Sequence, residues 1–257
     1  MQRYKFVFVM NDNKTNTYSY RVLPQDLDGK RHFRAVAMER TLMNAAANAA
    51  DDRNFGTFKL MDTGGVSWIL LKMAFEMDQM PQEDELISIE TWVEKVSSLL
   101  TSRNFIIRNA EGAIIGHATS EWAILNLETR RPVNITTDTS ITGCATGITV
   151  PVEMPGRIAT ITPGEETSRH TIKVSYSDID YNGHTNSVQY LQWMLDSYPI
   201  EKVFDNKIAR LEIVYAHEVR YGESVDVLYK DLEDGSTLFA AKAPDGSDCV
   251  RARIVWK

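Results

Sequence analysis

The stretch SDIDYNGHTN, residues 177–186, brings carboxylate, carboxamide and imidazole side chains together in ten positions. Asp178, Asp180 and Asn182 stand at the first, third and fifth places of an EF-hand calcium loop, with a glycine at the sixth. The twelfth place, where that loop needs a bidentate glutamate, holds Gln189, and a strand-like segment precedes the stretch instead of a helix. A calcium site is therefore the weakest interpretation.

Two other interpretations of this corner stay open. Aspartate, asparagine and glycine are the residues of a tight turn, and Asn186 can cap the helix that follows. In an enzyme, the Asn182 amide and the backbone N–H groups from His184 to Asn186 could polarise a carbonyl group. The sequence holds no GxSxG, P-loop, GxGxxG or HExxH motif, so this corner is the main catalytic candidate.

The residues around the corner predict a strand over 171–177 and a helix over 186–199, which Pro199 ends. Four strand-like runs follow, and the last two turns carry Asp-Gly pairs, the strongest short-range signal for a hairpin. These runs cover residues 208–219, 224–232, 236–243 and 249–256.

The first half of the chain repeats this order. A strand near Tyr20 and an Ala- and Met-rich helix over 33–52 precede extended runs over 67–77, 85–96, 99–109 and 113–127. A shift of 152 positions lays D-[LI]-D-x-x-x-H of residues 26–32 over the same pattern in residues 178–184, with Lys30 opposite Asn182. We therefore predict a duplication, in which each half is a long helix packed on an antiparallel sheet, an α+β fold. The predicted bounds are 1–131, a connector over 132–168, and 169–257.

Composition narrows the class of protein. The chain has 257 residues, of which 43% are hydrophobic and 25% charged, as in a globular protein. No apolar run reaches the ~18 residues of a membrane span, and FVFVM near the N-terminus is too short for a secretory signal. A formal net charge of −7 argues against non-specific nucleic-acid binding. Cys144 and Cys249 form no disulfide or zinc pattern, so we expect a cytoplasmic protein without a bound metal.

Three segments together resemble one family. SDIDYNGHTNSVQYLQWMLD, residues 177–196, resembles the D-x-D-x-N-x-H-x-N-N-x-x-Y-x-x-W-x-x-[DE] signature of the acyl–acyl carrier protein thioesterases of plants and bacteria. LEIVYAHEV, residues 211–219, resembles their L-E-Y-x-x-E segment, and ATSEWAILNLETRRP, residues 118–132, is similar to A-T-S-x-W-x-x-x-N-x-x-T-R-R. The resemblance implies a tandem, or double, hot dog fold and a thioester hydrolase of fatty acid metabolism without a cofactor. Its substrate would be a fatty acyl chain on the phosphopantetheine of acyl carrier protein.

The resemblance implies four catalytic residues, Asp180, Asn182, His184 and Glu218. Many plant members have a cysteine after the glutamate, but this chain has Val219, so a cysteine nucleophile is not expected there. The segment EVRYGES is also one residue longer than the usual E-C-G-R-D-S. We expect the Glu218 carboxylate to emerge from the 208–219 strand beside an apolar pocket, where burial would favour a base that activates water, or a direct nucleophile. Asn182 would hold the carbonyl oxygen, and Asp180 would orient His184 toward water or the departing thiol.

Five apolar residues of the first half are candidates for an acyl-chain tunnel, with core packing as the alternative for each. They are Met38, Leu42, Met43, Trp68 and Met73.

Acyl carrier proteins are acidic, so an acidic enzyme needs a local basic patch to bind one. Arg130 with Arg131, and Arg251 with Arg253, are the two candidate pairs, and a solvated charged face is the alternative for both.

Two further functions remain open at this stage. Hot dog folds also carry hydratase and dehydratase activity on acyl thioesters, and a non-catalytic fatty-acyl binding protein would share the fold. The sequence also leaves open the acyl chain length, the choice between carrier protein and coenzyme A, and the oligomeric state, for which a homodimer is one option.

Overall fold

The structure is a computed structural model that describes residues 14–257. The FVFVM run lies outside the described residues. By its internal contacts the chain divides into two compact units. Unit 1 comprises Met1–Ile69 and Asp78–Val152, and unit 2 comprises Leu70–Met77 and Glu153–Lys257. The predicted connector is thus divided, and its residues up to Val152 belong to unit 1.

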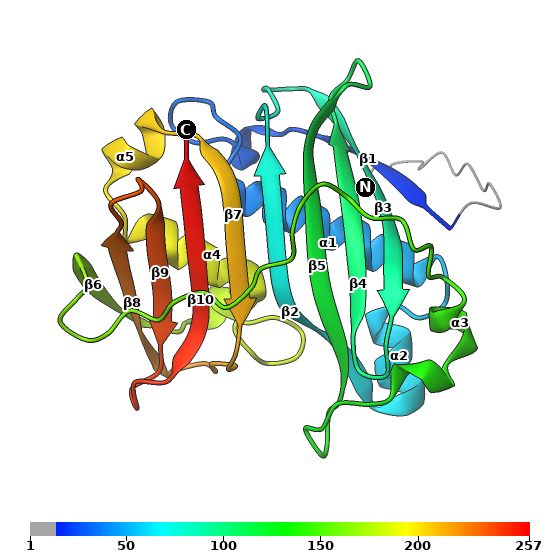
Figure 1. Ribbon diagram of the computed structural model, residues 1–257. Coiled ribbons are helices and arrows are strands. Elements are labelled where there is room, and N and C mark those ends of the chain that lie inside the picture. The colour runs from blue at the N-terminus through cyan, green and yellow to red at the C-terminus, as the bar shows by residue number, and fades with distance from the viewer. Residues whose placement is uncertain (1–13) are drawn as a thin grey trace. The chain divides into compact units, whose positions relative to one another are not determined.

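Unit 1 is a helix packed on an antiparallel sheet (Figure 1). Its strands lie in the order β1-β3-β4-β5, and α1 packs on β1 and β3. The short helices α2 and α3, and the 3-10 turns, were not predicted. The elements are β1 (Asn16–Arg21), η1 (Pro24–Asp26), α1 (Ala35–Asp51), α2 (Thr57–Gly64), β2 (Val66–Met77, shared with unit 2), β3 (Leu86–Val96), β4 (Thr101–Arg108), β5 (Ile114–Asn126), η2 (Ile135–Thr137) and α3 (Thr139–Thr142).

The composition of α1 explains why it lies against the sheet. Small alanines recur along the helix and let it approach the strands closely, while Met38 and Leu42 are fully buried. Each buried side chain of this size stabilises the fold by roughly 1.5–3 kcal/mol. The long, buried helix predicted for the first half is confirmed.

Unit 2 has the same plan. Its strands lie in the order β2-β7-β10-β9-β8-β6, and α4 packs on β8 and β9 (Figure 1). The predicted Asp-Gly turns are confirmed, with positive φ at Gly235 (80°) and Gly246 (84°). The elements are β6 (Ser168–Lys173), η3 (Tyr176–Asp178), α4 (Ser187–Asp196), α5 (Ile200–Asp205), β7 (Ile208–Tyr215), β8 (Ser224–Asp231), β9 (Thr237–Lys242) and β10 (Asp248–Trp256).

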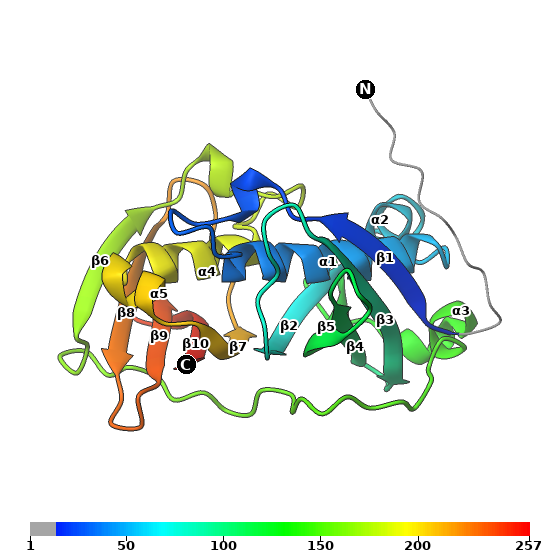
Figure 2. The same ribbon diagram turned by 90° about the horizontal axis from the view of Figure 1, so that it is seen from above.

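Residues 153–167 cross the face of the unit 2 sheet opposite α4 (Figure 2). Arg251 Nη1 donates to the Ile158 carbonyl at 2.7 Å, and Lys242 Nζ donates to Thr160 Oγ1 at 3.0 Å. Ile158 also joins a hydrophobic cluster with residues of β8 and β9. Both faces of this sheet are therefore covered, which is why every residue of β9 is buried.

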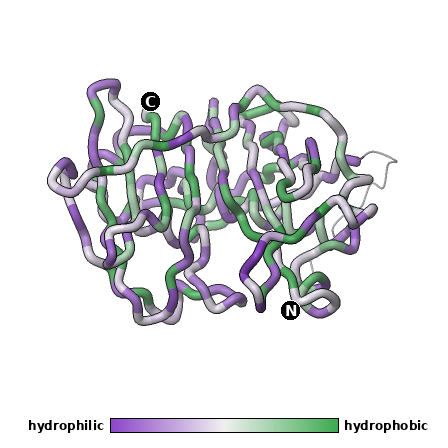
Figure 3. The backbone as a smooth tube through the Cα atoms, turned by 60° about the horizontal axis from the view of Figure 1, so that its bottom comes forward, coloured by the Kyte–Doolittle hydropathy of each residue, from purple (hydrophilic) through white to green (hydrophobic). Residues whose placement is uncertain are grey.

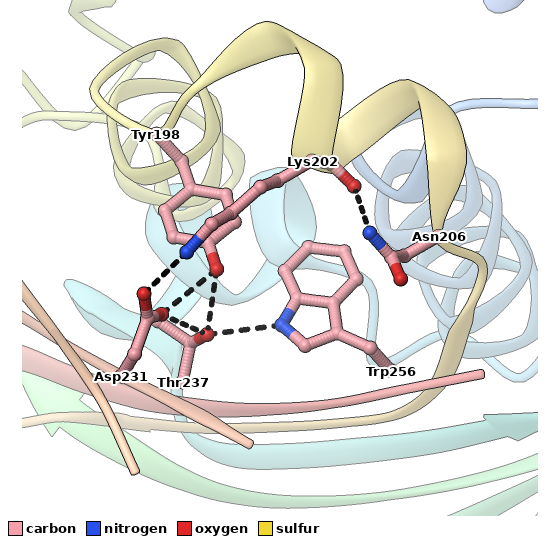
Figure 4. Close-up of polar contacts among 6 residues, drawn as sticks. All are labelled: Tyr198, Lys202, Asn206, Asp231, Thr237 and Trp256. Carbon is pink, nitrogen blue, oxygen red and sulfur yellow. Dashed lines mark hydrogen bonds and ion pairs between the residues drawn. The ribbon is translucent and has the colours of Figure 1, made fainter. Parts of the chain in front are cut away.

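A cluster of polar and aromatic side chains joins the end of α4 and the start of α5 to the sheet (Figure 4). The Tyr198 ring stacks on Trp256 at 5.5 Å, and its hydroxyl donates to Asp231 Oδ1 at 2.8 Å. Lys202 Nζ donates to Asp231 Oδ2 at 2.5 Å, and Thr237 Oγ1 donates to Asp231 Oδ1. Burial opposes ionisation of Asp231, but the hydrogen bonds from Lys202, Tyr198 and Thr237 outweigh it and lower the pKa of this carboxyl.

Among residues 14–257, no helix is both long and apolar enough to cross a membrane. Figure 3 shows hydrophobic stretches that are short and interrupted by hydrophilic residues.

Candidate active site

The corner between β6 and α4 is built by two aspartates. Asp178, 5% exposed, accepts hydrogen bonds on Oδ2 from Ser175 N (2.7 Å) and Ser175 Oγ (2.8 Å). Asp180 Oδ1 accepts from the backbone N–H groups of Asn182 (2.8 Å) and His184 (3.4 Å). Both carboxylates therefore hold the backbone of the corner, as the turn interpretation predicted.

The first half of the chain forms the same corner in unit 1. The 152-residue shift found in the sequence reproduces the hydrogen bonds pair by pair, and the residue with positive φ is Arg31 (64°) in unit 1 and Gly183 (76°) in unit 2. The predicted duplication is therefore supported by backbone geometry. The equivalent bonds are Asp28 N to His32 O (2.9 Å) and Asp180 N to His184 O (2.9 Å); Arg31 N to Asp28 O (3.0 Å) and Gly183 N to Asp180 O (3.0 Å); Arg34 N to Asp26 O (2.9 Å) and Asn186 N to Asp178 O (2.8 Å); Lys30 N to Asp28 Oδ1 (2.8 Å) and Asn182 N to Asp180 Oδ1 (2.8 Å).

The two corners differ in what the histidine ring contacts. In unit 1, His32 Nδ1 lies 3.5 Å from Asp28 Oδ2 of its own corner. In unit 2, His184 Nε2 lies 3.2 Å from Glu218 Oε2, which comes from another segment. The ring of His184 makes no ion pair with Asp180 in the described part of the chain. Asp180 instead accepts a hydrogen bond from the His184 backbone N–H, so its expected role in orienting the ring stays a prediction.

Glu218 does not lie on a strand. The predicted run over 208–219 ends early, because β7 stops at Tyr215 and Glu218 lies in the loop over 216–223. Its side chain is 40% exposed, whereas that of His184 is 13% exposed. The expected burial of this carboxylate is therefore wrong, and the carboxylate is open to water.

Hydrogen bonds fix the loop on both sides of Glu218. Thr185 donates to the Val219 carbonyl from its backbone N (2.8 Å) and from Oγ1 (3.0 Å). The Cys249 carbonyl accepts from the backbone N–H groups of Ala216 (2.8 Å) and His217 (3.1 Å). These bonds hold Glu218 opposite His184, and sequence reasoning missed the part played by Thr185. The only signal was its place in the corner, beside the histidine.

The backbone N–H groups from His184 to Asn186 are not available to polarise a carbonyl group. They donate within unit 2, to Asp180 Oδ1, Val219 O and Asp178 O respectively. That expectation is wrong, because the corner uses these donors itself. Asn186 does cap α4, since its Oδ1 accepts from Val188 N at 3.1 Å.

Asn182 presents a polar atom without a match. Its Oδ1 is buried and has no hydrogen-bond partner among the described residues. A buried polar atom without a partner costs about 1–3 kcal/mol. The Asn182 amide therefore lacks part of its hydrogen bonding among the described residues.

The thiols lie in other surroundings. Cys144 and Cys249 are buried and belong to different units. Burial raises the pKa of the Cys249 thiol to about 11, which disfavours the nucleophilic thiolate. Within residues 14–257, no three His, Cys, Asp or Glu side chains are grouped so that they could hold a metal ion.

The five candidate acyl-chain residues do not all belong to the same unit. Met38, Leu42 and Met73 are fully buried, and Met73 belongs to unit 2, paired with Ile213, not to the first half.

Trp68 and Met43 are half-buried in unit 1. The Trp68 ring packs on Phe55 at 6.3 Å and its Nε1 donates to the Phe55 carbonyl at 2.9 Å, as expected for core packing.

Both candidate basic pairs have defined surroundings. Arg130 and Arg131 are exposed in a tight turn after β5, where the Arg131 carbonyl accepts from Asn126 N. Arg251 and Arg253 are engaged within unit 2, by Ile158 and Asp248, and by Asp234 and Ser236.

Comparisons with known proteins agree with this architecture. The family profile described as "Acyl-ACP thioesterase N-terminal domain" matches residues 13–141, and "Acyl-ACP thioesterase C-terminal domain" matches residues 161–257. An oleoyl-acyl carrier protein thioesterase of Coriandrum sativum is 27% identical over 192 residues, which cover 71% of this chain and 52% of that protein. The chain thus spans about half the length of the curated relatives it matches.

Two solved structures are similar over nearly the whole chain. An acyl-ACP thioesterase from Bacteroides thetaiotaomicron is 31% identical and superposes with a TM-score of 0.85, over 95% of this chain and 98% of that one. A 12:0-ACP thioesterase from Umbellularia californica is 18% identical with a TM-score of 0.88, over 97% and 99%. These likenesses confirm the predicted α+β, double hot dog fold.

Proposed function

Because the chain belongs to the acyl-ACP thioesterase family, we propose that it hydrolyses the thioester between a fatty acyl chain and the phosphopantetheine of acyl carrier protein. Water is consumed, and the products are the free fatty acid and the carrier thiol. The observation that carries this proposal is the 3.2 Å contact between His184 Nε2 and Glu218 Oε2, at a corner that also presents Asn182.

Glu218 acts as the general base in this proposal. Its exposed carboxylate reaches water and removes a proton as the water oxygen attacks the thioester carbon. The contact with His184 keeps that proton beside the reacting centre. When the tetrahedral intermediate collapses, the carbon–sulfur bond breaks and the departing thiolate accepts the proton.

Asn182 stabilises the oxyanion. The helix-start N–H groups are engaged within the corner, so the side-chain amide is the donor that the corner can offer. We assign this role to Nδ2 of Asn182, a hydrogen-bond donor in the same turn as His184. One such donor contributes about 10²–10³-fold in kcat.

The test measures hydrolysis of acyl carrier protein thioesters by Glu218→Gln and Asn182→Ala. We expect losses of about 10²–10⁴-fold for the first and about 10²-fold for the second. His32→Ala is the matched control, because it removes the equivalent histidine of the unit 1 corner, and we expect it to keep most of the activity.

The products decide between this function and its rivals. Free acid supports hydrolysis, whereas an enoyl or hydroxyacyl thioester would indicate a hydratase or dehydratase, and tight binding without turnover a fatty-acyl binding protein. Wild-type rates in folded Glu218→Gln and Asn182→Ala would refute the assignment of the site.

Acyl-chain contacts by Met38, Leu42, Met43, Trp68 and Met73 remain proposals, as do Arg130 and Arg131 as carrier contacts. A cytoplasmic location and a homodimer also remain predictions.

A further inference from the structure

Exposed tyrosines gather around the corner. The most exposed large apolar side chains of residues 14–257 are Tyr176 (89%) and Tyr221 (70%), and Tyr181 is also exposed (55%). Every exposed tyrosine in the described part of the chain thus lies in η3, in the corner or in the Glu218 loop. Single exposed apolar residues are ordinary, but a group of aromatic residues at one place indicates an interaction surface.

Backbone pairing holds the segments that carry these tyrosines together. Val174 N donates to the Glu223 carbonyl at 2.9 Å, and Gly222 N donates to the Val174 carbonyl at 3.0 Å. Tyr176 follows Val174 by two residues, and Tyr221 directly precedes Gly222. The chain just before η3, where Tyr176 lies, is therefore held against the loop that carries Tyr221.

Tyr181 connects the pair to the reacting groups. It lies in the turn of the corner, directly before Asn182. The corner is joined to the Glu218 loop by the Thr185 bonds to the Val219 carbonyl. Tyr181 and Tyr221 therefore lie on the two segments that carry the candidate catalytic groups.

Two cations accompany the tyrosines. Lys173 and Arg220 are exposed, and neither side chain forms an ion pair within residues 14–257. Glu218 and Glu223 are the acids of this loop, and Glu223 accepts a hydrogen bond from the Arg220 backbone N at 2.8 Å. Although Glu218 and Glu223 lie in the same loop, these two cations supply local positive charge for an acidic partner in a chain of net charge −7.

We propose that Tyr176, Tyr181 and Tyr221, with Lys173 and Arg220, form the surface on which the acyl carrier protein docks; we call this surface the tyrosine rim. The inference rests on the proposed function and adds the place of binding. A carrier that delivers its tethered thioester to Glu218 must sit against the surface around that residue. Aromatic side chains with nearby cations are the composition that the centres of protein interfaces favour.

The experiment compares a carrier-linked substrate with a carrier-free one. The double variant Tyr176→Ser/Tyr221→Ser is assayed with acyl carrier protein thioester and with the same acyl group on N-acetylcysteamine. We expect KM for the carrier substrate to rise about tenfold with kcat unchanged, because contacts of this kind contribute mainly to binding. We expect kcat/KM for the carrier-free substrate to stay the same.

Ile200→Ser is the matched control, since Ile200 is 56% exposed in the same unit but belongs to α5. It should leave kcat and KM unchanged for both substrates. Lys173→Glu/Arg220→Glu should also raise KM for the carrier substrate, and the salt dependence of that KM should change with it.

Calorimetric titration with acyl carrier protein separates this inference from the proposed function. If Kd for the carrier protein rises about tenfold from wild type to the double tyrosine variant, the rim is supported, even if no thioester is hydrolysed. Unchanged binding and unchanged KM would overturn the rim while leaving hydrolysis intact. An equal loss on both substrates would also overturn it, because the tyrosines would then act on the reaction and not on docking.

Discussion

Thr185 offers the sharpest test of how the site is held. Thr185→Val replaces the hydroxyl by a methyl group of the same shape, and the side chain is 7% exposed, so no new surface is created. The Val219 carbonyl loses the bond from Oγ1 but keeps the backbone bond at 2.8 Å. One hydrogen bond contributes about 0.5–1.5 kcal/mol net. We expect the variant to lose about 1 kcal/mol of stability, or about 2–4 °C in Tm.

The same bond bears on catalysis because Val219 follows Glu218 directly. A looser carbonyl lets the carboxylate move relative to His184. If about 1 kcal/mol of positioning is lost in the transition state, kcat falls about fivefold. KM should not change, since Thr185 lies beneath the loop and not on the tyrosine rim.

Steady-state hydrolysis and urea unfolding measure the two effects separately. Thr185→Ser keeps the hydroxyl, so its kcat should equal that of wild type. If Thr185 had a purely structural role, both variants would lose stability and neither would lose kcat. In a Glu218→Gln background, Thr185→Val should cause no further loss of rate, because the group it positions is already gone. A full fivefold additional loss in that background would refute the reasoning, as would wild-type kcat in a destabilised Thr185→Val.

Two predictions concern stability. The pKa of Asp231 is lowered from its ordinary value of 3.8, so its ionised form stabilises the folded state above that pH, and this stabilisation is lost as the pH falls below it. The difference in urea midpoint between wild type and Asp231→Asn should therefore shrink between pH 6 and pH 3. A constant difference would contradict this prediction. Lys242 is 8% exposed and donates to Asp248 Oδ1 at 2.5 Å, so Lys242→Met should cost about 3 kcal/mol by leaving a poorly compensated carboxylate. Lys230→Met is its control, because the Lys230–Glu165 pair is exposed and should contribute less than about 1 kcal/mol.

Local chemistry explains which elements could be predicted. The Asp-Gly turns form as predicted, because glycine adopts positive φ at little cost. The helix predicted over 186–199 ends at Asp196, and the chain turns at Pro199 into α5. The short helix α2 carries no strong sequence pattern, and it was missed.

Contacts between distant segments explain what could not be predicted in the site. The motif indicated that His184 and Glu218 act together, but nothing near Glu218 showed that β7 ends at Tyr215. Likewise, one of the corner's three N–H groups, that of Thr185, donates to Val219, which is 34 positions away. Such pairings follow from how the sheet places its loops, and local sequence does not contain them.

The repeated corner separates structural residues from candidate catalytic ones. Asp28 and Asp180 accept the same backbone hydrogen bonds, so this aspartate is needed to form the corner whether or not chemistry occurs there. Only the unit 2 histidine contacts a glutamate from a second segment, and only that corner carries an amide at the position of Lys30. The assignment of hydrolysis should therefore rest on Asn182 and on the histidine–glutamate pair. Loss of activity on replacing Asp180 would report a collapsed corner and would not identify a catalytic acid.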